Sequence, residues 1–235
     1  MGKLRKILIT GTSRGIGRAL AKSLAESGHK VVGCSRGESS VQHANYIHIP
    51  TDISVDEDIH NLISSIGSTQ DGLEVLINNA GQKIDSPALL TTTAQTSAML
   101  QTNFIGAMMI TRESLKLMKR GRFGRVINIS SIAVPLASKG ASAYSATKAA
   151  LAQFGHVLAR EVADDDITVN TIGISVAEGS GMVERLDPQS LERTRSSLLK
   201  PDNIGVEEVA HAVEFFISDS ARNITDQTLY FGGAR

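Results

Sequence analysis

The chain has 235 residues, 41% of them hydrophobic and 20% charged, which suits one globular domain with a sizeable core over residues 1–235. Lys plus Arg and Asp plus Glu number 24 each, so the formal charge is zero and neither a nucleic-acid partner nor an anionic membrane surface is expected. The single cysteine, Cys34, excludes an internal disulfide and a cysteine-rich metal site, and no hydrophobic run reaches the roughly 18 residues of a membrane span, so we expect a cytoplasmic protein without metal.

The first predicted strand covers residues 4–10, and the first predicted helix covers residues 19–27. Between them lies the sequence GTSRGIG, whose glycines permit a tight turn and let backbone N–H groups approach a pyrophosphate. The spacing is G-x-x-x-G-x-G rather than the usual G-x-G-x-x-G, so alone it also fits a plain turn. Its place between strand and helix favours a dinucleotide site, with contacts expected at Gly11, Ser13, Arg14, Gly15, Ile16 and Gly17.

The second predicted strand, residues 30–35, bears on the choice of cofactor. In a dinucleotide-binding fold, an acidic residue near the end of this strand binds the ribose 2′-hydroxyl of NAD. Here Ser35 and Arg36 occupy that place, and Arg14 lies in the glycine turn. A guanidinium can bind a phosphate through two hydrogen bonds, so the two arginines favour the 2′-phosphate of NADP(H). The alternative is that both are ordinary surface arginines.

A third strand is predicted at residues 46–50, followed by a helix at residues 55–66 with one hydrophobic face. Asp52 and Ile53 lie between them. A carboxylate and a backbone N–H at the end of a strand suit the adenine of a bound cofactor. Asp52 could equally cap the helix that follows.

The fourth predicted strand, residues 73–77, ends in the sequence NNAG. Small residues and amides suit a cofactor contact, although Asn-rich turns also end many strands. The expected contacts are Asn79, Ala80 and Gly81. A long helix is predicted next, at residues 93–120. Asn103 lies inside this helix between hydrophobic residues, so the asparagine either stabilises the fold or takes part in function.

The next predicted strand, residues 125–130, is joined by a loop to a helix at residues 141–163. Tyr144 and Lys148 lie one turn apart on the same face of that helix. A nearby ammonium favours the phenolate and lowers the pKa of a tyrosine. The short pattern Y-x-x-x-K also fits two side chains that only share a helix face. Ser131 follows the strand, where an α/β sheet often places site residues.

The remaining predicted elements are a strand at residues 167–172, a helix at 206–218 and a strand at 227–231. The stretch between the first two is weakly patterned, and a substrate lid is expected at about residues 175–200. The alternation of strands and helices along the chain predicts an α/β domain, with a parallel sheet covered by helices on both faces.

Three motifs together make the chain resemble the short-chain dehydrogenase/reductase family: T-G-x-x-x-G-x-G at residues 10–17, N-N-A-G at 78–81 and Y-x-x-x-K at 144–148. The resemblance covers nearly the whole chain and implies a Rossmann-type doubly wound sheet of seven parallel strands in the order 3-2-1-4-5-6-7. It implies that Tyr144 and Lys148 also contact the cofactor. The catalytic tetrad that it implies is Asn103, Ser131, Tyr144 and Lys148.

The resemblance also implies a role for each member of the tetrad. Tyr144 would donate a proton to a carbonyl oxygen that Ser131 holds; the family register favours Ser131 over other serines near the tyrosine. Lys148 would lower the pKa of Tyr144 and bind the nicotinamide ribose. Asn103 would hold a water that relays protons to Lys148.

Within the family, the 3-oxoacyl-[acyl-carrier-protein] reductases of fatty acid biosynthesis are the most similar, on the stretches GRVINISS, LAREVADDDITVN and NITDQTLYFGG. This implies NADPH-dependent reduction of a small-molecule or acyl-carrier-bound carbonyl. It also implies a homodimer or homotetramer, packed through the helices around Asn103 and Tyr144. An oxidoreductase for a sugar, a polyketide or another secondary metabolite remains an alternative, as does a non-catalytic dinucleotide sensor.

The chain departs from the family pattern at a few positions. Ile174 and Ser175 stand where the family usually has Pro-Gly, and Gly179 stands where a threonine usually contacts the nicotinamide. Asp226 stands where a glycine is common. Most of these departures surround the nicotinamide and the lid, so they bear on the substrate and leave the tetrad intact.

Overall fold

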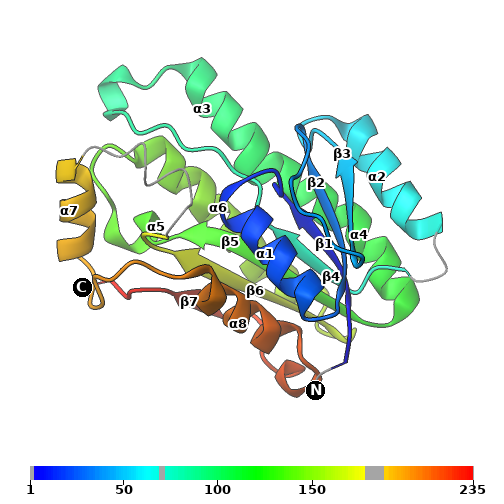
Figure 1. The fold of residues 1–235 in the computed structure, drawn as a ribbon. Helices are drawn as coiled ribbons and strands as arrows, with labels where there is room; N and C mark the ends of the chain where they lie inside the picture. The colour runs from blue at the N-terminus through cyan, green and yellow to red at the C-terminus, as the bar shows by residue number, and fades with distance from the viewer. Residues whose placement is uncertain (1–2, 69–71, 178–187, 235) are drawn as a thin grey trace.

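The structure is a computed structural model that describes residues 3–68, 72–177 and 188–234. In these residues, seven parallel strands form one sheet in the order β3-β2-β1-β4-β5-β6-β7 (Figure 1). This confirms the order that the family resemblance implied. The strands are β1 (Lys6–Thr10), β2 (Lys30–Ser35), β3 (Tyr46–Pro50), β4 (Val75–Asn78), β5 (Gly124–Ser131), β6 (Ile167–Ile174) and β7 (Thr228–Tyr230).

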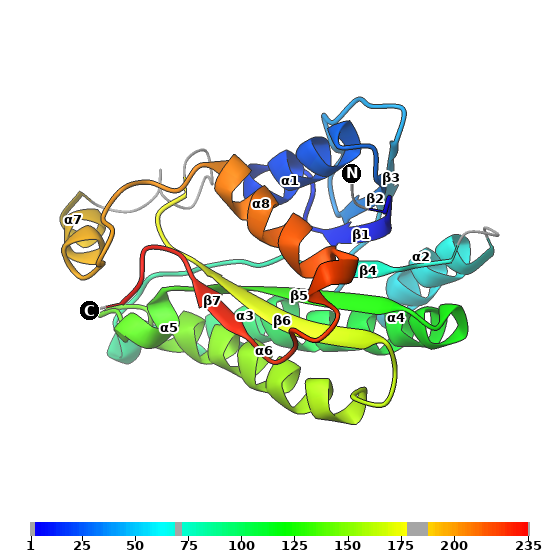
Figure 2. The ribbon, with the colours of Figure 1, turned by 90° about the horizontal axis from the view of Figure 1, so that it is seen from below.

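Helices cover both faces of the sheet, with α1 and α8 on one face and α2, α4 and α6 on the other (Figure 2). No helix in the described residues is both long enough and hydrophobic enough to cross a bilayer. The α-helices are α1 (Gly15–Glu26), α2 (Asp56–Ser68), α3 (Thr93–Leu100), α4 (Ala107–Gly121), α5 (Ala133–Leu136), α6 (Ser142–Glu161), α7 (Pro188–Ser196) and α8 (Val206–Ile217). Shorter helical turns are η1 (Ala88–Leu90), the π-helical η2 (Gln101–Gly106) and η4 (Asp219–Ala221).

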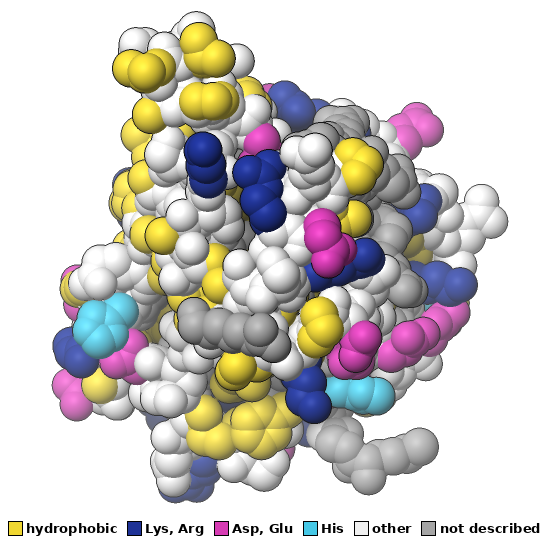
Figure 3. Space-filling model, turned by 90° about the vertical axis from the view of Figure 1, so that its left-hand side faces the viewer, with side chains coloured by type: hydrophobic (Ala, Val, Ile, Leu, Met, Phe, Trp, Pro, Cys, Tyr) yellow, Lys and Arg dark blue, Asp and Glu magenta, His cyan; other side chains and the backbone are white. Residues whose placement is uncertain are grey.

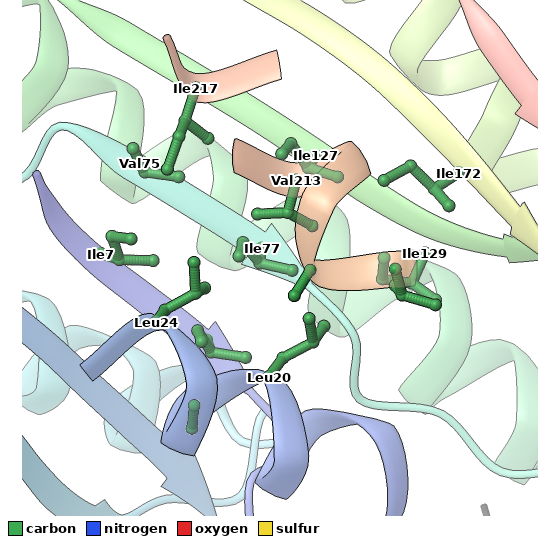
Figure 4. Close-up of a cluster of buried hydrophobic side chains, with 14 of the residues drawn as sticks. Ile7, Leu20, Leu24, Val75, Ile77, Ile127, Ile129, Ile172, Val213 and Ile217 are labelled. Carbon is green, nitrogen blue, oxygen red and sulfur yellow. The ribbon is translucent and has the colours of Figure 1, made fainter. Parts of the chain in front are cut away.

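The central strands are hydrophobic on both faces because each face supports a separate core. Side chains alternate along a strand, so Ile7 and Ile9 of β1 enter one core and Leu8 enters the other. Figure 4 shows the first core, where Leu20 and Leu24 of α1 lie against the sheet together with side chains of α8. The same alternation repeats in β4, which is buried along its whole length. Two packed layers of helices therefore hold the sheet and its loops in place.

Several element boundaries differ from the sequence predictions. Helix α1 begins at Gly15, inside the glycine turn, so the last two glycines belong to its first turn. The connection predicted as a loop before α6 contains the short helix α5. The predicted helix at residues 93–120 is interrupted by η2. Part of the expected lid, residues 178–187 with Gly179, lies outside the described residues; α7 follows it.

The strand order reverses between β1 and β4, because β2 lies on one side of β1 and β4 on the other. In doubly wound sheets, a ligand binds outside the carboxyl ends of the strands at such a switch point. Here the glycine turn follows β1, and the NNAG turn follows β4. The two cofactor motifs of the sequence therefore meet at this point.

Candidate active site

A cleft of about 650 Å³ lies along the carboxyl ends of the strands. Every residue expected to contact a cofactor lines it, and so do three of the four tetrad residues. In the part of the chain that the structure describes, no group of His, Cys, Asp and Glu side chains is arranged to hold a metal ion. The predicted residues that line the cleft are Gly11, Ser13, Arg14, Gly15, Ile16, Gly17, Arg36, Asp52, Ile53, Asn79, Ala80, Gly81, Ser131, Tyr144 and Lys148.

The glycine turn leaves no room for side chains where it faces the NNAG turn. Gly11 has a φ of +79°, a conformation that favours glycine. A Cβ on Gly17 would lie 2.3 Å from the carbonyl oxygen of Gly11 and 2.2 Å from Nδ2 of Asn79. The N-terminus of α1 has no side-chain cap and no acidic residue in its first turn. The first N–H groups of a helix have no partner within the helix, and the first turn of α1 lines the cleft, so the residues present fit a dinucleotide pyrophosphate.

Thr10 at the end of β1 ties the two turns together. Its Oγ1 accepts hydrogen bonds from the backbone N–H groups of Asn79 at 3.0 Å and Ala80 at 2.9 Å. The Nδ2 of Asn79 donates to the carbonyl oxygen of Thr10 at 2.8 Å. The Asn79 side chain therefore has a structural role, and the small residues beside it, Ala80 and Gly81, leave space in the cleft.

At the far end of the cleft, Arg14 and Arg36 line the wall together with Asp52. The Oδ1 of Asp52 accepts hydrogen bonds from the backbone N–H of Ser54 at 2.9 Å and from its hydroxyl at 2.6 Å. Asp52 thus closes a turn ahead of α2, and its side chain bonds to Ser54 before the helix begins at Asp56 rather than to the helix itself. Partial burial raises the pKa of Asp52, but the Ser54 hydrogen bonds and the charge of Arg36 outweigh it and hold the pKa below its usual value.

Tyr144 lies in the first turn of α6, and its side chain is buried among Met99, Ala133 and Ala141. The neighbouring Ser131 hydroxyl lowers the tyrosine pKa through hydrogen bonding. Burial has the larger, opposite effect, and together with the charge of Asp85 it raises the pKa of Tyr144 to about 12. The prediction that the pKa of Tyr144 is lowered is therefore wrong, because burial disfavours the charged phenolate more than the Ser131 hydroxyl favours it.

Lys148 lies one turn after Tyr144 and is also buried. Its Nζ donates a hydrogen bond to the carbonyl oxygen of Ile129 at 2.8 Å, at the inner end of the cleft. Burial lowers the pKa of Lys148 to about 8, since a charged ammonium is poorly solvated there. Near neutral pH the side chain still carries its charge, with donor hydrogens left for a ligand.

Asn103 lies beneath the cleft in the π-helical turn η2 and is fully buried. Its Oδ1 accepts from the backbone N–H of Gln82 at 2.8 Å, and its Nδ2 donates to the Gln82 carbonyl oxygen at 2.9 Å and to Oγ1 of Thr147 at 3.0 Å. These bonds tie the segment after β4 to α6. The structure thus shows a structural role for Asn103, and π-helical turns often lie at functional sites.

The structure also places residues in the cleft that the motifs did not indicate. Gln82, Lys83 and Asp85 follow the NNAG turn and line the cleft beside Tyr144. Ser175, one of the departures from the family pattern, lines it from the end of β6, and its buried Oγ has no hydrogen-bond partner. No periodicity or motif marks the first three, because only the folded chain brings them close to Tyr144.

The face of the molecule shown in Figure 3 carries α7 and the segment leading to α3. Hydrophobic side chains gather over that segment, where Leu89 and Leu90 are exposed, whereas charged side chains of both signs are spread over the rest.

Comparisons with known proteins agree with this geometry. The family model for short-chain dehydrogenases matches residues 5–190. The chain is 32% identical to the 3-oxoacyl-[acyl-carrier-protein] reductase FabG of Vibrio cholerae, over 96% of this chain and 95% of the relative. It is 34% identical to FabG of Rickettsia conorii, over 96% and 94%. A crystal structure of a protein assigned as a gluconate dehydrogenase from Agrobacterium tumefaciens shares the fold, with a TM-score of 0.89 over 97% of this chain and 94% of that one, at 24% identity.

Proposed function

Since the chain belongs to the short-chain dehydrogenase family, we propose that it is an NADPH-dependent reductase that converts a carbonyl group to an alcohol, with a 3-oxoacyl thioester as its substrate. The observation that carries this proposal is a buried tyrosine that lines the same cleft as Ser131, Lys148 and the glycine turn. The substrate class is supported by the relatives in Vibrio cholerae and Rickettsia conorii, which are 3-oxoacyl-[acyl-carrier-protein] reductases.

In the proposed reaction, bound NADPH supplies the hydride. Tyr144 supplies the proton as general acid, and its raised pKa keeps it protonated at neutral pH. Ser131 donates a hydrogen bond to the carbonyl oxygen and so orients the substrate and stabilises the charge that develops there. The neighbouring Ser145 cannot take this role readily, because its hydroxyl donates to the carbonyl oxygen of Ala133 at 2.7 Å.

Lys148 and Asn103 would support this proton donor from inside the protein. Lys148 uses one hydrogen for the Ile129 carbonyl oxygen, which leaves two to hold the nicotinamide ribose. Its charge would favour the tyrosinate left after proton transfer. Asn103 keeps one lone pair on Oδ1 for the relay water that the family resemblance suggests.

The substrate class is tested by comparing turnover across a panel of carbonyl compounds with NADPH. We expect the highest kcat/KM with acetoacetyl thioesters, and much lower values with small ketones and keto-sugars. A clear preference for a keto-sugar or another ketone would replace the 3-oxoacyl assignment while leaving the reductase assignment intact. Tight NADPH binding without turnover of any member of the panel would indicate a dinucleotide sensor instead.

Arg14 and Arg36 are expected to determine the preference for NADPH over NADH. Replacing both with alanine should raise KM for NADPH about 10- to 100-fold, as expected when charged hydrogen bonds to a phosphate are lost, and should change KM for NADH little. Arg18→Ala is the matched control, because Arg18 is exposed on α1 and does not line the cleft. A wild-type enzyme that prefers NADH would contradict the assignment.

We also propose that the protein acts in the cytoplasm as a homodimer or homotetramer. The exposed face of α6, where Val157 is 44% exposed, is a packing surface consistent with such an assembly. Sedimentation velocity at micromolar concentration measures the state directly, and a monomer would contradict this part of the proposal.

A further inference from the structure

A group of polar side chains joins the glycine turn to the segment that carries Arg36, and it has no part in the roles proposed above. The hydroxyl of Tyr46, on β3, donates a hydrogen bond to Oγ1 of Thr12 at 3.0 Å and lies 3.1 Å from Nδ1 of His48. The Nε2 of His48, also on β3, lies 2.9 Å from the carbonyl oxygen of Gly37. Because a carbonyl oxygen can only accept, Nε2 carries the hydrogen of this bond. Thr12, Tyr46 and His48 thus form a network of hydrogen bonds, the His48 network, that ends on Gly37.

The inner part of this network is enclosed by the protein. The side chains of Thr12 and Tyr46 are buried. Gly33 of β2 lies against both of them, and a Cβ at this position would lie 2.3 Å from the Tyr46 hydroxyl oxygen and 2.5 Å from Oγ1 of Thr12. The close approach of these two hydroxyls to β2 therefore requires a glycine. The partly exposed imidazole of His48 is held against this buried pair.

The network reaches the backbone beside both arginines that are expected to bind a 2′-phosphate. Thr12 lies two residues before Arg14 in the glycine turn, and Gly37 directly follows Arg36. The carbonyl oxygen of Gly37 also accepts a hydrogen bond from Oγ of Ser35 at 2.7 Å. Both arginines line the cleft, whereas the two β3 side chains of the network do not. The network can therefore hold the walls of the cleft in place without touching a ligand there.

We propose that His48 is a positioning residue for the 2′-phosphate of the cofactor: by holding the Gly37 carbonyl oxygen, it keeps Arg36 where its guanidinium can meet that phosphate. This role rests on the proposed preference for NADPH. A guanidinium binds a phosphate best in a defined geometry, so a segment that is free to move loses part of the affinity. The glycine turn keeps its own bond to β2, in which the N–H of Gly11 donates to the Cys34 carbonyl oxygen at 2.7 Å. Loss of the His48 bond should therefore affect the 2′-phosphate and spare the rest of the nucleotide.

The test compares two ligands that differ only in the 2′-phosphate, adenosine 2′,5′-bisphosphate and adenosine 5′-monophosphate. Isothermal titration calorimetry gives Kd for both without nicotinamide, substrate or turnover. Wild-type protein is expected to bind the bisphosphate more tightly. His48→Leu removes the N–H donor and is expected to weaken binding of the bisphosphate about 10-fold, while Kd for the monophosphate stays within about twofold of wild type.

Two further variants separate the hydrogen bond from general effects of the substitution. In His48→Gln, the side-chain amide nitrogen is as many bonds from the backbone as Nε2 and can donate to the same carbonyl oxygen, so Kd for the bisphosphate should stay within about threefold of wild type. His60→Leu is the matched control, because His60 is exposed on α2 and does not line the cleft; it should leave both Kd values unchanged. If thermal denaturation shows that His48→Leu does not fold, Tyr46→Phe takes its place, since it removes the hydroxyl beside Nδ1 and should also weaken the bisphosphate alone.

A selective loss of bisphosphate affinity in His48→Leu that is restored in His48→Gln supports the inference. An equal loss for both ligands would overturn it, because His48 would then only stabilise the fold. A wild-type preference for the bisphosphate that survives in His48→Leu would contradict the inference alone and leave the proposed cofactor intact. Equal binding of the two ligands by wild-type protein would contradict the preference for NADPH and the inference together, so the two failures are distinguishable.

Discussion

Replacing Tyr144 with phenylalanine is expected to lower kcat for carbonyl reduction by about 10³-fold, the range that general acid catalysis contributes. The change removes the hydroxyl that donates the proton but keeps the ring that packs against Met99 and Ala133. The affinity for NADPH should change little, because the glycine turn and the arginines at the far end of the cleft are untouched. Steady-state kinetics and a cofactor titration measure the two quantities separately.

Tyr230→Phe is the matched control, since it removes the same hydroxyl from a tyrosine outside the described cleft. It should retain near wild-type kcat. Thermal denaturation of both variants shows whether the fold is intact. Turnover within a few-fold of wild type in Tyr144→Phe would contradict the proposed mechanism, because the reaction would then proceed without the hydroxyl that is assigned to donate the proton.

The strand order followed from the family resemblance, whereas the parallel sheet and the place of the cofactor cleft followed from the sequence for a physical reason. Parallel strands buried on both faces are continuous hydrophobic runs, such as VLIN in β4, and the glycines of the turn after β1 mark a close approach of backbones. These are local signals, so they could be found without tertiary structure. The motifs then predicted which residues would line the cleft, and the structure brings those residues together.

The electrostatics of Tyr144 could not be predicted in the same way. The spacing between Tyr144 and Lys148 is a local feature, and it indicated a lowered pKa for the tyrosine. The burial of Tyr144 and the position of Asp85 depend on the whole fold, and both raise that pKa. The contacts of Asn103 in the π-helical turn were also not predictable, because its side chain bonds to Gln82 and Thr147 from other elements.

Asp226 stands where the family usually has a glycine, and its backbone conformation accounts for that preference. It has a φ of +62°, a conformation that favours glycine, which explains why a glycine is common at this position. Its carboxylate lies 2.6 Å from Nδ1 of His156 and 3.1 Å from a guanidinium nitrogen of Arg160, both on α6. These contacts help to stabilise the aspartate. The resemblance could locate the departure, but only the structure shows what accompanies it.

Gly17→Ala is expected to lower the affinity for NADPH by about 100-fold or more and to cost about 1–3 kcal/mol of the free energy of unfolding, as overpacking does. The added methyl group would overlap the Gly11 carbonyl oxygen and Nδ2 of Asn79. The Asn79 amide is fixed by its bond to Thr10, so the glycine turn must move away from the NNAG turn. That movement displaces the N–H groups of α1 from the position where a pyrophosphate would bind.

Gly37→Ala is the matched control for this change, because Gly37 lines the same cleft and a Cβ there would meet no atom within 4 Å. It should alter both quantities little, or stabilise the protein slightly by restricting the unfolded chain. A fluorescence titration with NADPH and thermal denaturation measure affinity and stability for the two variants. If Gly17→Ala bound NADPH as tightly as Gly37→Ala, the pyrophosphate could not rest on this turn, and the cofactor would have to bind elsewhere along the cleft.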